Sequence, residues 1–328
     1  MVKKTVGLIA APFTPLHNDG QLNLDVVEHY ANKLHQDGVV GAFICGTTGE
    51  GMSLTTSERC QLTERWVEAA PDGLKIIVHV GHNSLVDARE LAAHAQRAGA
   101  DGIACMPPTF FKPLGLEGVV TWCQQIAAAA PELPFYYYHI PSMGGLNVLV
   151  SQFLQAAGPR IPNLVGAKFT YEDLADFEQC LKLEDGRYDM LFGRDELLLS
   201  ALALGARGAV GSTYNFAAPV YLSIISAFNL GDHQRARELQ ALAVQMIDLL
   251  VGCGPQPIAT FKKWMAEVGV DCGPARLPLE PPPTIEFALT LSQLQALGLP
   301  QFDASGLPQP AALGLRNGLH QKPIAGHV

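Results

Sequence analysis

Eight short apolar runs, separated by amphipathic stretches, are the feature that most restricts how this chain of 328 residues can fold. The runs are rich in branched side chains and predict buried strands of a parallel sheet, and the stretches between them predict connecting helices. Eight such units with no linker between them are typical of one (β/α)8 barrel rather than a doubly wound sheet. The predicted strands are Val6 to Phe13, Gly41 to Cys45, Lys75 to Val80, Gly102 to Met106, Pro134 to His139, Leu164 to Phe169, Met190 to Phe192 and Gly208 to Gly211.

The rest of the chain extends this barrel and adds no second domain. Three more helical stretches follow, Asp232 to Leu250, Pro257 to Val268 and Thr284 to Leu297, and we expect them to pack beside the barrel. Residues 299–328 are rich in Gly, Pro, Ala and Gln without apolar periodicity, so we expect a poorly ordered tail. Residues 1–298 are therefore predicted to form one barrel domain, with its C-terminal helices from about residue 232.

Charge and cysteine content narrow the classes of partner. The chain has 22 Lys and Arg against 31 Asp and Glu, a net charge of -9, whereas nucleic acids and anionic membranes need a basic surface. No apolar run approaches the roughly 18 residues of a membrane span, so a small-molecule substrate is expected. Seven cysteines without a C-x-x-C pair favour a reducing, cytoplasmic location. Only 16% of residues are charged, against about 25% in an average domain, which is explained if a surface is buried between subunits.

One lysine lies inside an otherwise apolar predicted strand. Lys168 is near the C-terminal end of Leu164 to Phe169, the end at which barrel enzymes carry their chemistry. A lysine desolvated there has a lowered pKa, and the neutral amine can attack a carbonyl group and form a Schiff base. The alternative is a snorkelling or salt-bridged lysine at the barrel rim, so the partner residues must decide.

A phenol stands at the end of the preceding predicted strand. Adjacent strands are about 4.8 Å apart, so Tyr138 can converge with Lys168 on one substrate and shuttle a proton. Tyr136 and Tyr137, the two tyrosines before it, are better explained as aromatic packing. The sequence therefore predicts one catalytic pair, Lys168 and Tyr138.

Small and acidic residues follow two other predicted strands. Thr47 and Thr48, in the loop Gly46 to Glu50, can form a pocket of carboxylate size with exposed backbone N–H groups, although Gly and Thr are equally common in turns and caps. The loop lacks the Gly-Lys-Thr ending of a nucleotide phosphate loop. Asp195 and Glu196 follow the seventh strand, where they suit sugar hydroxyls or the first turn of a helix.

The chain offers little for a metal ion. His79 and His82 are three residues apart, a spacing that on a strand turns the rings to opposite faces, and no third ligand follows nearby. We therefore predict neither a metal nor another cofactor.

Four segments, taken together, resemble those of a known family. Gly46 to Glu50, Tyr138 to Pro141, Lys168 with Thr170, and Gly208 to Asn215 are similar in order and spacing to the N-acetylneuraminate lyase branch of the pyruvate-dependent class I aldolases. The segments that resemble the eukaryotic-type form are Tyr136 to Pro141, Leu191 to Gly193 with Asp195 and Glu196, and Arg276 to Leu279. The resemblance implies a (β/α)8 barrel with a C-terminal helical extension, usually a homotetramer, that cleaves N-acetylneuraminate reversibly to N-acetylmannosamine and pyruvate.

The resemblance also implies a role for each matching residue. Lys168 matches the Schiff-base lysine and Tyr138 the proton-transferring tyrosine. The residues that match substrate contacts are Thr47 and Thr48 for the pyruvate carboxylate, Thr170 for the C4 hydroxyl, and Gly193, Asp195, Glu196 and Ser212 for the polyhydroxylated tail. Two features depart from the family pattern. Pro108 to Phe111 lacks the tyrosine that many relatives supply to a neighbouring subunit, and His139 stands where Asn is common.

Three other functions compete with this interpretation. Dihydrodipicolinate synthase is similar along the whole barrel but needs an arginine shortly after the Tyr-x-x-Pro turn, where this chain has Ser142 to Gly144. The sequence therefore favours a neutral, hydroxylated electrophile. Another pyruvate-dependent aldolase or dehydratase for a keto-deoxy sugar acid, and a catalytically silent sugar-acid-binding protein, remain open.

Overall fold

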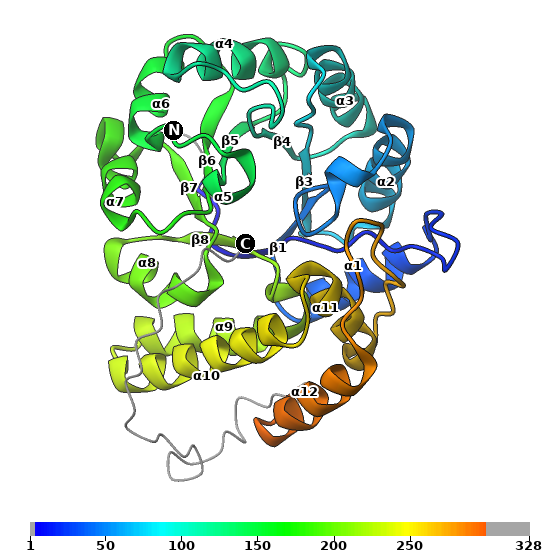
Figure 1. The fold of residues 1–328 in the computed structure, drawn as a ribbon. Coiled ribbons are helices and arrows are strands. Elements are labelled where there is room, and N and C mark those ends of the chain that lie inside the picture. Colours follow the sequence, from blue (N-terminus) through cyan, green and yellow to red (C-terminus); the bar gives the residue numbers. More distant parts are fainter. Residues whose placement is uncertain (1–3, 300–328) are drawn as a thin grey trace.

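A closed barrel of eight parallel strands forms the centre of the molecule (Figure 1). The computed structural model describes residues 4–299, and the strands follow one another around the barrel in sequence order until β8 pairs with β1. This confirms the predicted (β/α)8 fold. The strands are β1 (Gly7–Ala10), β2 (Gly41–Ile44), β3 (Lys75–His79), β4 (Gly102–Cys105), β5 (Phe135–His139), β6 (Leu164–Phe169), β7 (Asp189–Phe192) and β8 (Gly208–Gly211).

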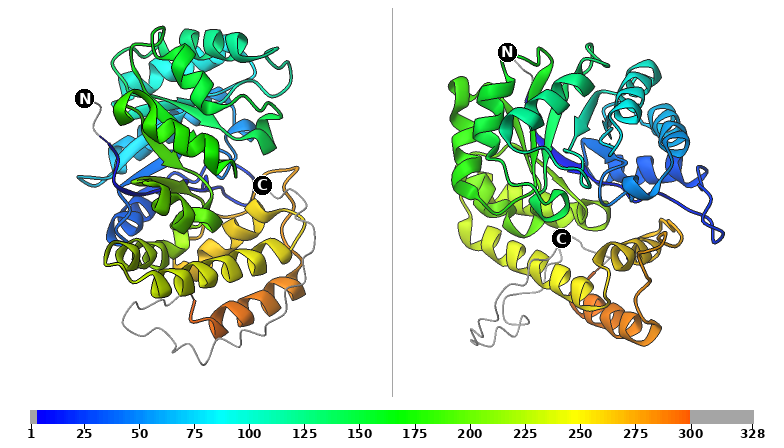
Figure 2. Two further views of the ribbon diagram at one scale, coloured as in Figure 1. Left: turned by 90° about the vertical axis from the view of Figure 1, so that its left-hand side faces the viewer. Right: turned by 45° about the horizontal axis from the view of Figure 1, so that its top comes forward.

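Helices follow the strands and cover the outside of the barrel (Figures 1 and 2). Local capping sets several of their ends: Thr55 and Glu58 form a capping box at the start of α2, and Gly99 ends α3 with φ = 86°, a conformation that glycine adopts without strain. The α-helices are α1 (Val26–Gln36), α2 (Thr56–Ala69), α3 (Leu85–Ala98), α4 (Leu116–Ala127), α5 (Pro141–Gly144), α6 (Val150–Ala157), α7 (Leu174–Lys182), α8 (Leu198–Leu204), α9 (Tyr214–Asn229), α10 (His233–Gly252), α11 (Pro257–Trp264) and α12 (Thr284–Ala296). The 3-10 helices are η1 (Gly51–Ser53), η2 (Leu183–Gly186), η3 (Asp195–Leu197) and η4 (Met265–Val268).

Alternation along β5 divides its three tyrosines between two layers. Tyr136 and Tyr138 belong to the apolar cluster inside the barrel. Tyr137 faces outward and stacks on Phe153 of α6, with ring centroids 4.1 Å apart. The Tyr136 hydroxyl donates a hydrogen bond to Asp189 Oδ2 at 2.9 Å. Tyr136 and Tyr137 are therefore packing residues, as predicted.

The C-terminal helices gather on one side of the barrel (Figures 1 and 2). α10 packs along α9, and both α11 and α12 contact α10, so the three predicted helical stretches lie beside the barrel as expected. The predicted tail falls on residues outside the described range, except for Leu299, which is buried and whose N–H donates to Leu294 O of α12 at 3.0 Å. Within residues 4–299 no single helix is long and apolar enough to cross a membrane, and one bent pair, His233–Gly252 with Pro257–Val268, passes that test only when taken together.

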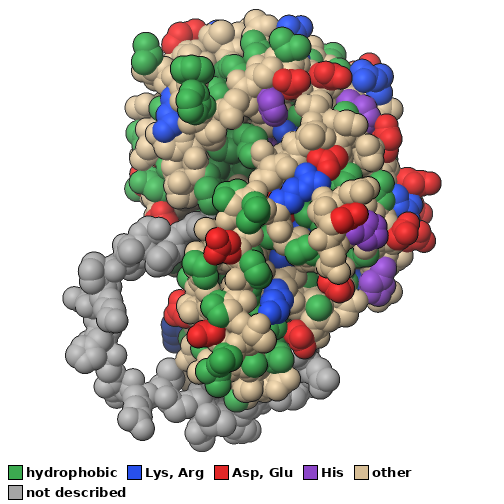
Figure 3. Space-filling view, turned by 45° about the vertical axis from the view of Figure 1, so that its right-hand side comes forward, with side chains coloured by type: hydrophobic (Ala, Val, Ile, Leu, Met, Phe, Trp, Pro, Cys, Tyr) green, Lys and Arg blue, Asp and Glu red, His purple; other side chains and the backbone are tan. Residues whose placement is uncertain are grey.

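Basic and acidic side chains are interspersed over the surface seen in Figure 3. Among the described residues on that face, the Lys and Arg side chains are separated by acidic and apolar ones and form no continuous basic area.

Candidate active site

A cavity of about 600 Å³ opens where the strands end. Every residue that the sequence nominated for catalysis or substrate binding lines it, because the loops after parallel strands all emerge at the same end of a barrel. These residues are Thr47 and Thr48 after β2, Tyr138 on β5, Lys168 and Thr170 at the end of β6, Gly193, Asp195 and Glu196 after β7, and Ser212 after β8. The fold thus brings all nine together.

Lys168 is buried at the floor of this cavity. Only 4% of its surface is exposed, and its Nζ lies 4.0 Å from the centroid of the Phe43 ring and 4.3 Å from that of the Tyr138 ring. Burial lowers the pKa of Lys168 to about 7, an effect that the negative charge of Asp195 partly opposes. The position rules out a snorkelling lysine at the rim and leaves a large fraction of neutral amine near pH 7.

Tyr138 lies directly beside Lys168 because the two residues are register partners on β5 and β6. Its hydroxyl is 3.1 Å from Thr47 Oγ1, and the side chain is almost fully buried. Burial raises the pKa of Tyr138 to about 12, with the Thr47 hydroxyl acting in the opposite direction. The phenol is therefore protonated at rest and can pass a proton on only while it receives another.

The loop that carries Thr47 and Thr48 is a tight turn closed by its own backbone. The Gly51 N–H donates to Gly46 O at 3.0 Å, and the Thr14 hydroxyl donates to Gly49 O at 2.6 Å. A Cβ on Gly51 would lie only 1.9 Å from Cys45 O, so the turn needs glycine there. The glycine-rich sequence is thus both a turn signal and the support of the two cavity-lining threonines.

Two buried oxygen atoms of residues that line the cavity make no hydrogen bond of ordinary length and angle within residues 4–299. They are Thr170 Oγ1 and Asp195 Oδ1, whereas Asp195 Oδ2 accepts hydrogen bonds from the N–H and the hydroxyl of Thr213 at 3.0 and 2.6 Å. Burial raises the pKa of Asp195 to about 6. Unpaired buried oxygens are costly, which makes both atoms candidates for binding substrate hydroxyls.

Gly193 makes room for one of these oxygens. A Cβ at this position would lie 2.1 Å from Thr170 Oγ1, and the Gly193 N–H is held by Phe169 O at 2.7 Å. A larger residue would push against Thr170. Gly193 therefore contributes only its backbone to the site and leaves space for the Thr170 side chain.

Several lining residues were not foreseen from the sequence. α10 and α11 supply apolar walls through Ile247, Val251, Ile258 and Phe261, and the charged residues not foreseen are Glu172, Arg194 and Asp248. Arg194 pairs with Glu172 at 2.7 Å. The position of Arg194 between Gly193 and Asp195 could have identified it as a cavity residue from the sequence. The α10 and α11 residues have no such local sequence feature, because their role depends on where those helices dock.

Both features that depart from the family pattern lie outside the cavity lining. His139 faces outward on β5, among the rings of Tyr137, Phe169 and Tyr171, and burial lowers its pKa to about 4. Phe110 and Phe111 are 77% and 85% exposed.

The two histidines considered as metal ligands lie on different elements, because His79 ends β3 and His82 stands in the loop after it. The Nδ1 atom of His79 lies 3.0 Å from Cys45 O, whereas His82 is 3.5 Å from Asp87. Over the part of the chain that the structure describes, no group of three or more His, Cys, Asp or Glu residues is arranged to hold a metal ion.

Comparison with known proteins identifies the family. The model of the dihydrodipicolinate synthetase family matches residues 4–290. The chain belongs to this family. Within it, the chain is 43% identical over 280 residues to N-acetylneuraminate lyase A of Xenopus laevis, covering 84% of this chain and 91% of the relative. Human N-acetylneuraminate lyase is 42% identical over 281 residues, covering 85% and 88%.

Solved structures of the family agree with the observed barrel. The N-acetylneuraminate lyase of Proteus mirabilis superposes with a TM-score of 0.86 at 43% identity, covering 90% of this chain and 99% of the other. A dihydrodipicolinate synthase from Bacillus anthracis has a similar TM-score, 0.83, at only 26% identity, with 90% and 99% covered. Shape therefore does not separate these two members of the family, and the side chains in the cavity must do so.

Proposed function

We propose that this chain is a Schiff-base aldolase that cleaves N-acetylneuraminate reversibly to N-acetylmannosamine and pyruvate. The observation that carries the proposal is a buried lysine with a pKa of about 7, paired in register with a buried tyrosine at the floor of the cavity. The cavity's threonines and acidic residues suit a substrate with a carboxylate at one end and hydroxyls at the other. Ser142 to Gly144, after the Tyr-x-x-Pro turn, supplies no arginine for a semialdehyde carboxylate.

The first step is imine formation at Lys168. Its neutral Nζ attacks the C2 ketone of the open-chain sugar acid, and loss of water leaves a protonated Schiff base. Thr47 and Thr48 hold the carboxylate beside this carbon, so that the ketone is presented to the amine before the reaction begins. The positive nitrogen then accepts the electron pair released when the bond between C3 and C4 breaks.

The second step removes the proton of the C4 hydroxyl. Tyr138 is a neutral phenol at rest, so it takes this proton while its own proton passes toward the substrate carboxylate, on the side where Thr47 lies 3.1 Å away. Thr170 lines the same cavity and orients the C4 hydroxyl. N-acetylmannosamine leaves as the aldehyde. The proton held at the carboxylate returns through Tyr138 to C3 of the lysine-bound enamine. Hydrolysis of the resulting Schiff base with water releases pyruvate and restores Lys168.

Pyruvate release from N-acetylneuraminate tests the substrate and the reaction together. We expect saturable release of one pyruvate per N-acetylmannosamine, measured with lactate dehydrogenase and by chromatography of the sugar. Faster release from another keto-deoxy sugar acid would favour the alternative aldolase or dehydratase. Calorimetric binding of N-acetylneuraminate without turnover would favour the sugar-acid-binding protein instead.

The lowered pKa of Lys168 predicts the pH dependence of imine formation. Only the neutral amine reacts, so the rate of borohydride trapping with pyruvate should rise about tenfold per pH unit below pH 7 and level off above it. Asp195 raises the pKa of Lys168, so Asp195→Asn should move the midpoint to lower pH. A midpoint near that of an ordinary lysine would contradict the desolvated amine.

Subunit assembly and location are proposals of the same kind. We propose a cytoplasmic homotetramer, supported by the family resemblance, by the low charged fraction of 16% and by the exposure of Phe110, Phe111 and Leu114 on the single chain. Light scattering of the purified chain measures the number of subunits. A monomer at micromolar concentration would overturn the assembly proposal.

A further inference from the structure

The mechanism leaves one fully buried ion pair without a role. Lys262 Nζ lies 2.7 Å from Glu50 Oε1, and neither side chain is exposed at all. Burying two charges is expensive, and a well-packed apolar pair is often at least as stable, so stability alone is a weak reason for this arrangement. The two residues are 212 positions apart and join the loop after β2 to α11.

Glu50 ends the loop that carries Thr47 and Thr48. Its backbone has φ = 54°, an unusual conformation for a residue with a side chain, and its N–H donates to Thr47 O at 3.0 Å. Its second carboxylate oxygen, Oε2, accepts the Arg276 N–H at 2.7 Å. Both oxygens of the Glu50 carboxylate are therefore bound by the C-terminal part of the chain. The hydrogen bond from the Glu50 N–H to Thr47 O links the position of Glu50 to that of Thr47.

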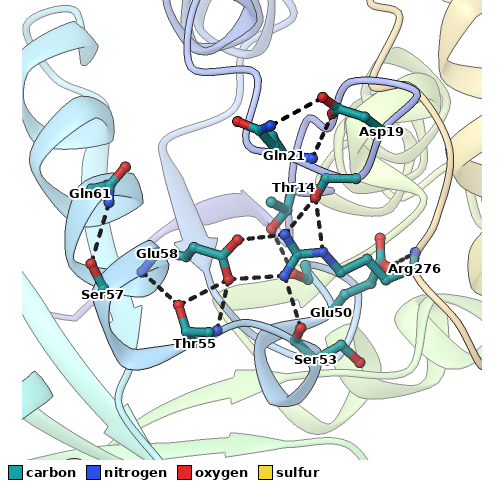
Figure 4. A network of polar contacts seen from close by, with 12 residues as sticks. Thr14, Asp19, Gln21, Glu50, Ser53, Thr55, Ser57, Glu58, Gln61 and Arg276 are labelled. Atoms are coloured by element: carbon teal, nitrogen blue, oxygen red, sulfur yellow. Dashed lines mark hydrogen bonds and ion pairs between the residues drawn. The ribbon is translucent and has the colours of Figure 1, made fainter.

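Arg276 is itself anchored to the β2 side of the barrel. Its guanidinium binds Glu58, whose Oε2 is 2.9 Å from Nη1, and donates to the carbonyl oxygens of Ser53 and Gly20 at 3.0 and 2.6 Å (Figure 4). Glu58 also closes the capping box of α2 with Thr55, which fixes the start of that helix. The Arg276 N–H is therefore a rigid donor rather than a mobile one.

The other end of the ion pair belongs to the cavity wall. Lys262 follows Phe261 on α11, and Ile258 lies one turn earlier, so the helix that supplies these two apolar lining residues also supplies the cation for Glu50. A shift of α11 would change the cavity wall and the loop after β2 at the same time.

We propose that Glu50 and Lys262 are positioning residues for carboxylate binding. Together with the Arg276 N–H, their ion pair sets the loop that presents Thr47 and Thr48 to the carboxylate of pyruvate and of the sugar acid. The inference rests on the proposed function, because it takes these threonines as the carboxylate pocket. It assigns to the C-terminal helices a specific task in substrate recognition.

The test compares two ketones that react with the same lysine. Borohydride trapping on Lys168 of the full-length chain is measured with pyruvate and with acetone, which lacks a carboxylate. Lys262→Met removes the ion pair with Glu50 at nearly constant side-chain length. We expect the ratio of pyruvate to acetone trapping rates to fall about tenfold, while the acetone rate stays within about twofold of wild type.

Two further variants separate positioning from stability. Lys263→Met is the matched control, since Lys263 is the next residue of α11 and its Nζ lies over the Phe287 ring instead, so the ratio should not change. The double variant Glu50→Gln with Lys262→Met removes both buried charges and should recover the melting temperature. The ratio of pyruvate to acetone trapping rates should stay low in the double variant, because the ion pair is still absent.

Three results would overturn the inference: an unchanged ratio in Lys262→Met, equal losses with both ketones, or a wild-type ratio in the double variant. Failure of the proposed function gives a different signature, in which wild type itself is not trapped by either ketone. In that case, calorimetric pyruvate binding to the same variants decides the role of the ion pair, since it does not depend on a Schiff base.

Discussion

Lys168→Met is expected to lower the rate of pyruvate release from N-acetylneuraminate by about 10⁴-fold or more, because it removes the only atom proposed to bond to the substrate. The residue lies among apolar and aromatic groups, with its Nζ 4.0 Å from the centre of the Phe43 ring, so methionine should fit without loss of the fold. The measurement is pyruvate release, together with peptide mass spectrometry after borohydride reduction in the presence of pyruvate. The adduct on residue 168 should disappear.

Lys75→Met provides the matched control for this experiment. Lys75 opens β3 at the opposite end of the barrel from the cavity, so the same substitution there should leave turnover within about twofold of wild type. A reduced pyruvate adduct at another lysine, or turnover by Lys168→Met above a hundredth of the wild-type rate, would contradict the assignment of the Schiff base.

Tyr138→Phe is expected to lower kcat by about 10²- to 10⁴-fold while changing pyruvate trapping on Lys168 by less than about threefold. The physical reason is that the phenol is proposed to move a proton in the carbon–carbon cleavage step, whereas imine formation requires only the neutral amine. The ring stays in place, so the packing against Phe43 and His79 is retained. Both quantities are measured on one preparation, by steady-state kinetics and by trapping.

Tyr137→Phe is the appropriate comparison, since it removes a hydroxyl from the adjacent residue, which faces the outer layer against Phe153. Its turnover should remain close to wild type. Equal losses of kcat and of pyruvate trapping in Tyr138→Phe would assign Tyr138 to substrate binding, and proton transfer would then need another group.

The prediction from sequence was most successful where the physical signal is local. Apolar runs and the helical spacing of apolar residues are properties of neighbouring positions. Seven of the eight predicted strands therefore contain the whole observed strand, β6 and β8 with identical bounds, and β7 starts one residue earlier than predicted, at Asp189. The order of the strands around the barrel follows the sequence. β1 is shorter than predicted and ends before Pro12, which has no N–H to donate to a ladder.

The catalytic pair could also be predicted from the sequence. Parallel strands that are consecutive in a barrel lie side by side with their C-terminal ends together, which is why Tyr138 and Lys168 had to meet. The nine nominated residues line one cavity for the same reason.

Only the tertiary structure decided the properties that depend on contacts between segments far apart in the sequence. The pKa of Lys168 depends on desolvation by groups from several strands, and no window of sequence contains them. The walls from α10 and α11, and the Lys262–Glu50 ion pair across 212 positions, depend on how those helices dock. The sequence by itself thus determined the barrel, through local periodicity, and the chemistry at its strand ends, through the residue types placed there. Docking of the C-terminal helices determined how that chemistry is enclosed and held in place, because it depends on contacts between residues far apart in the chain.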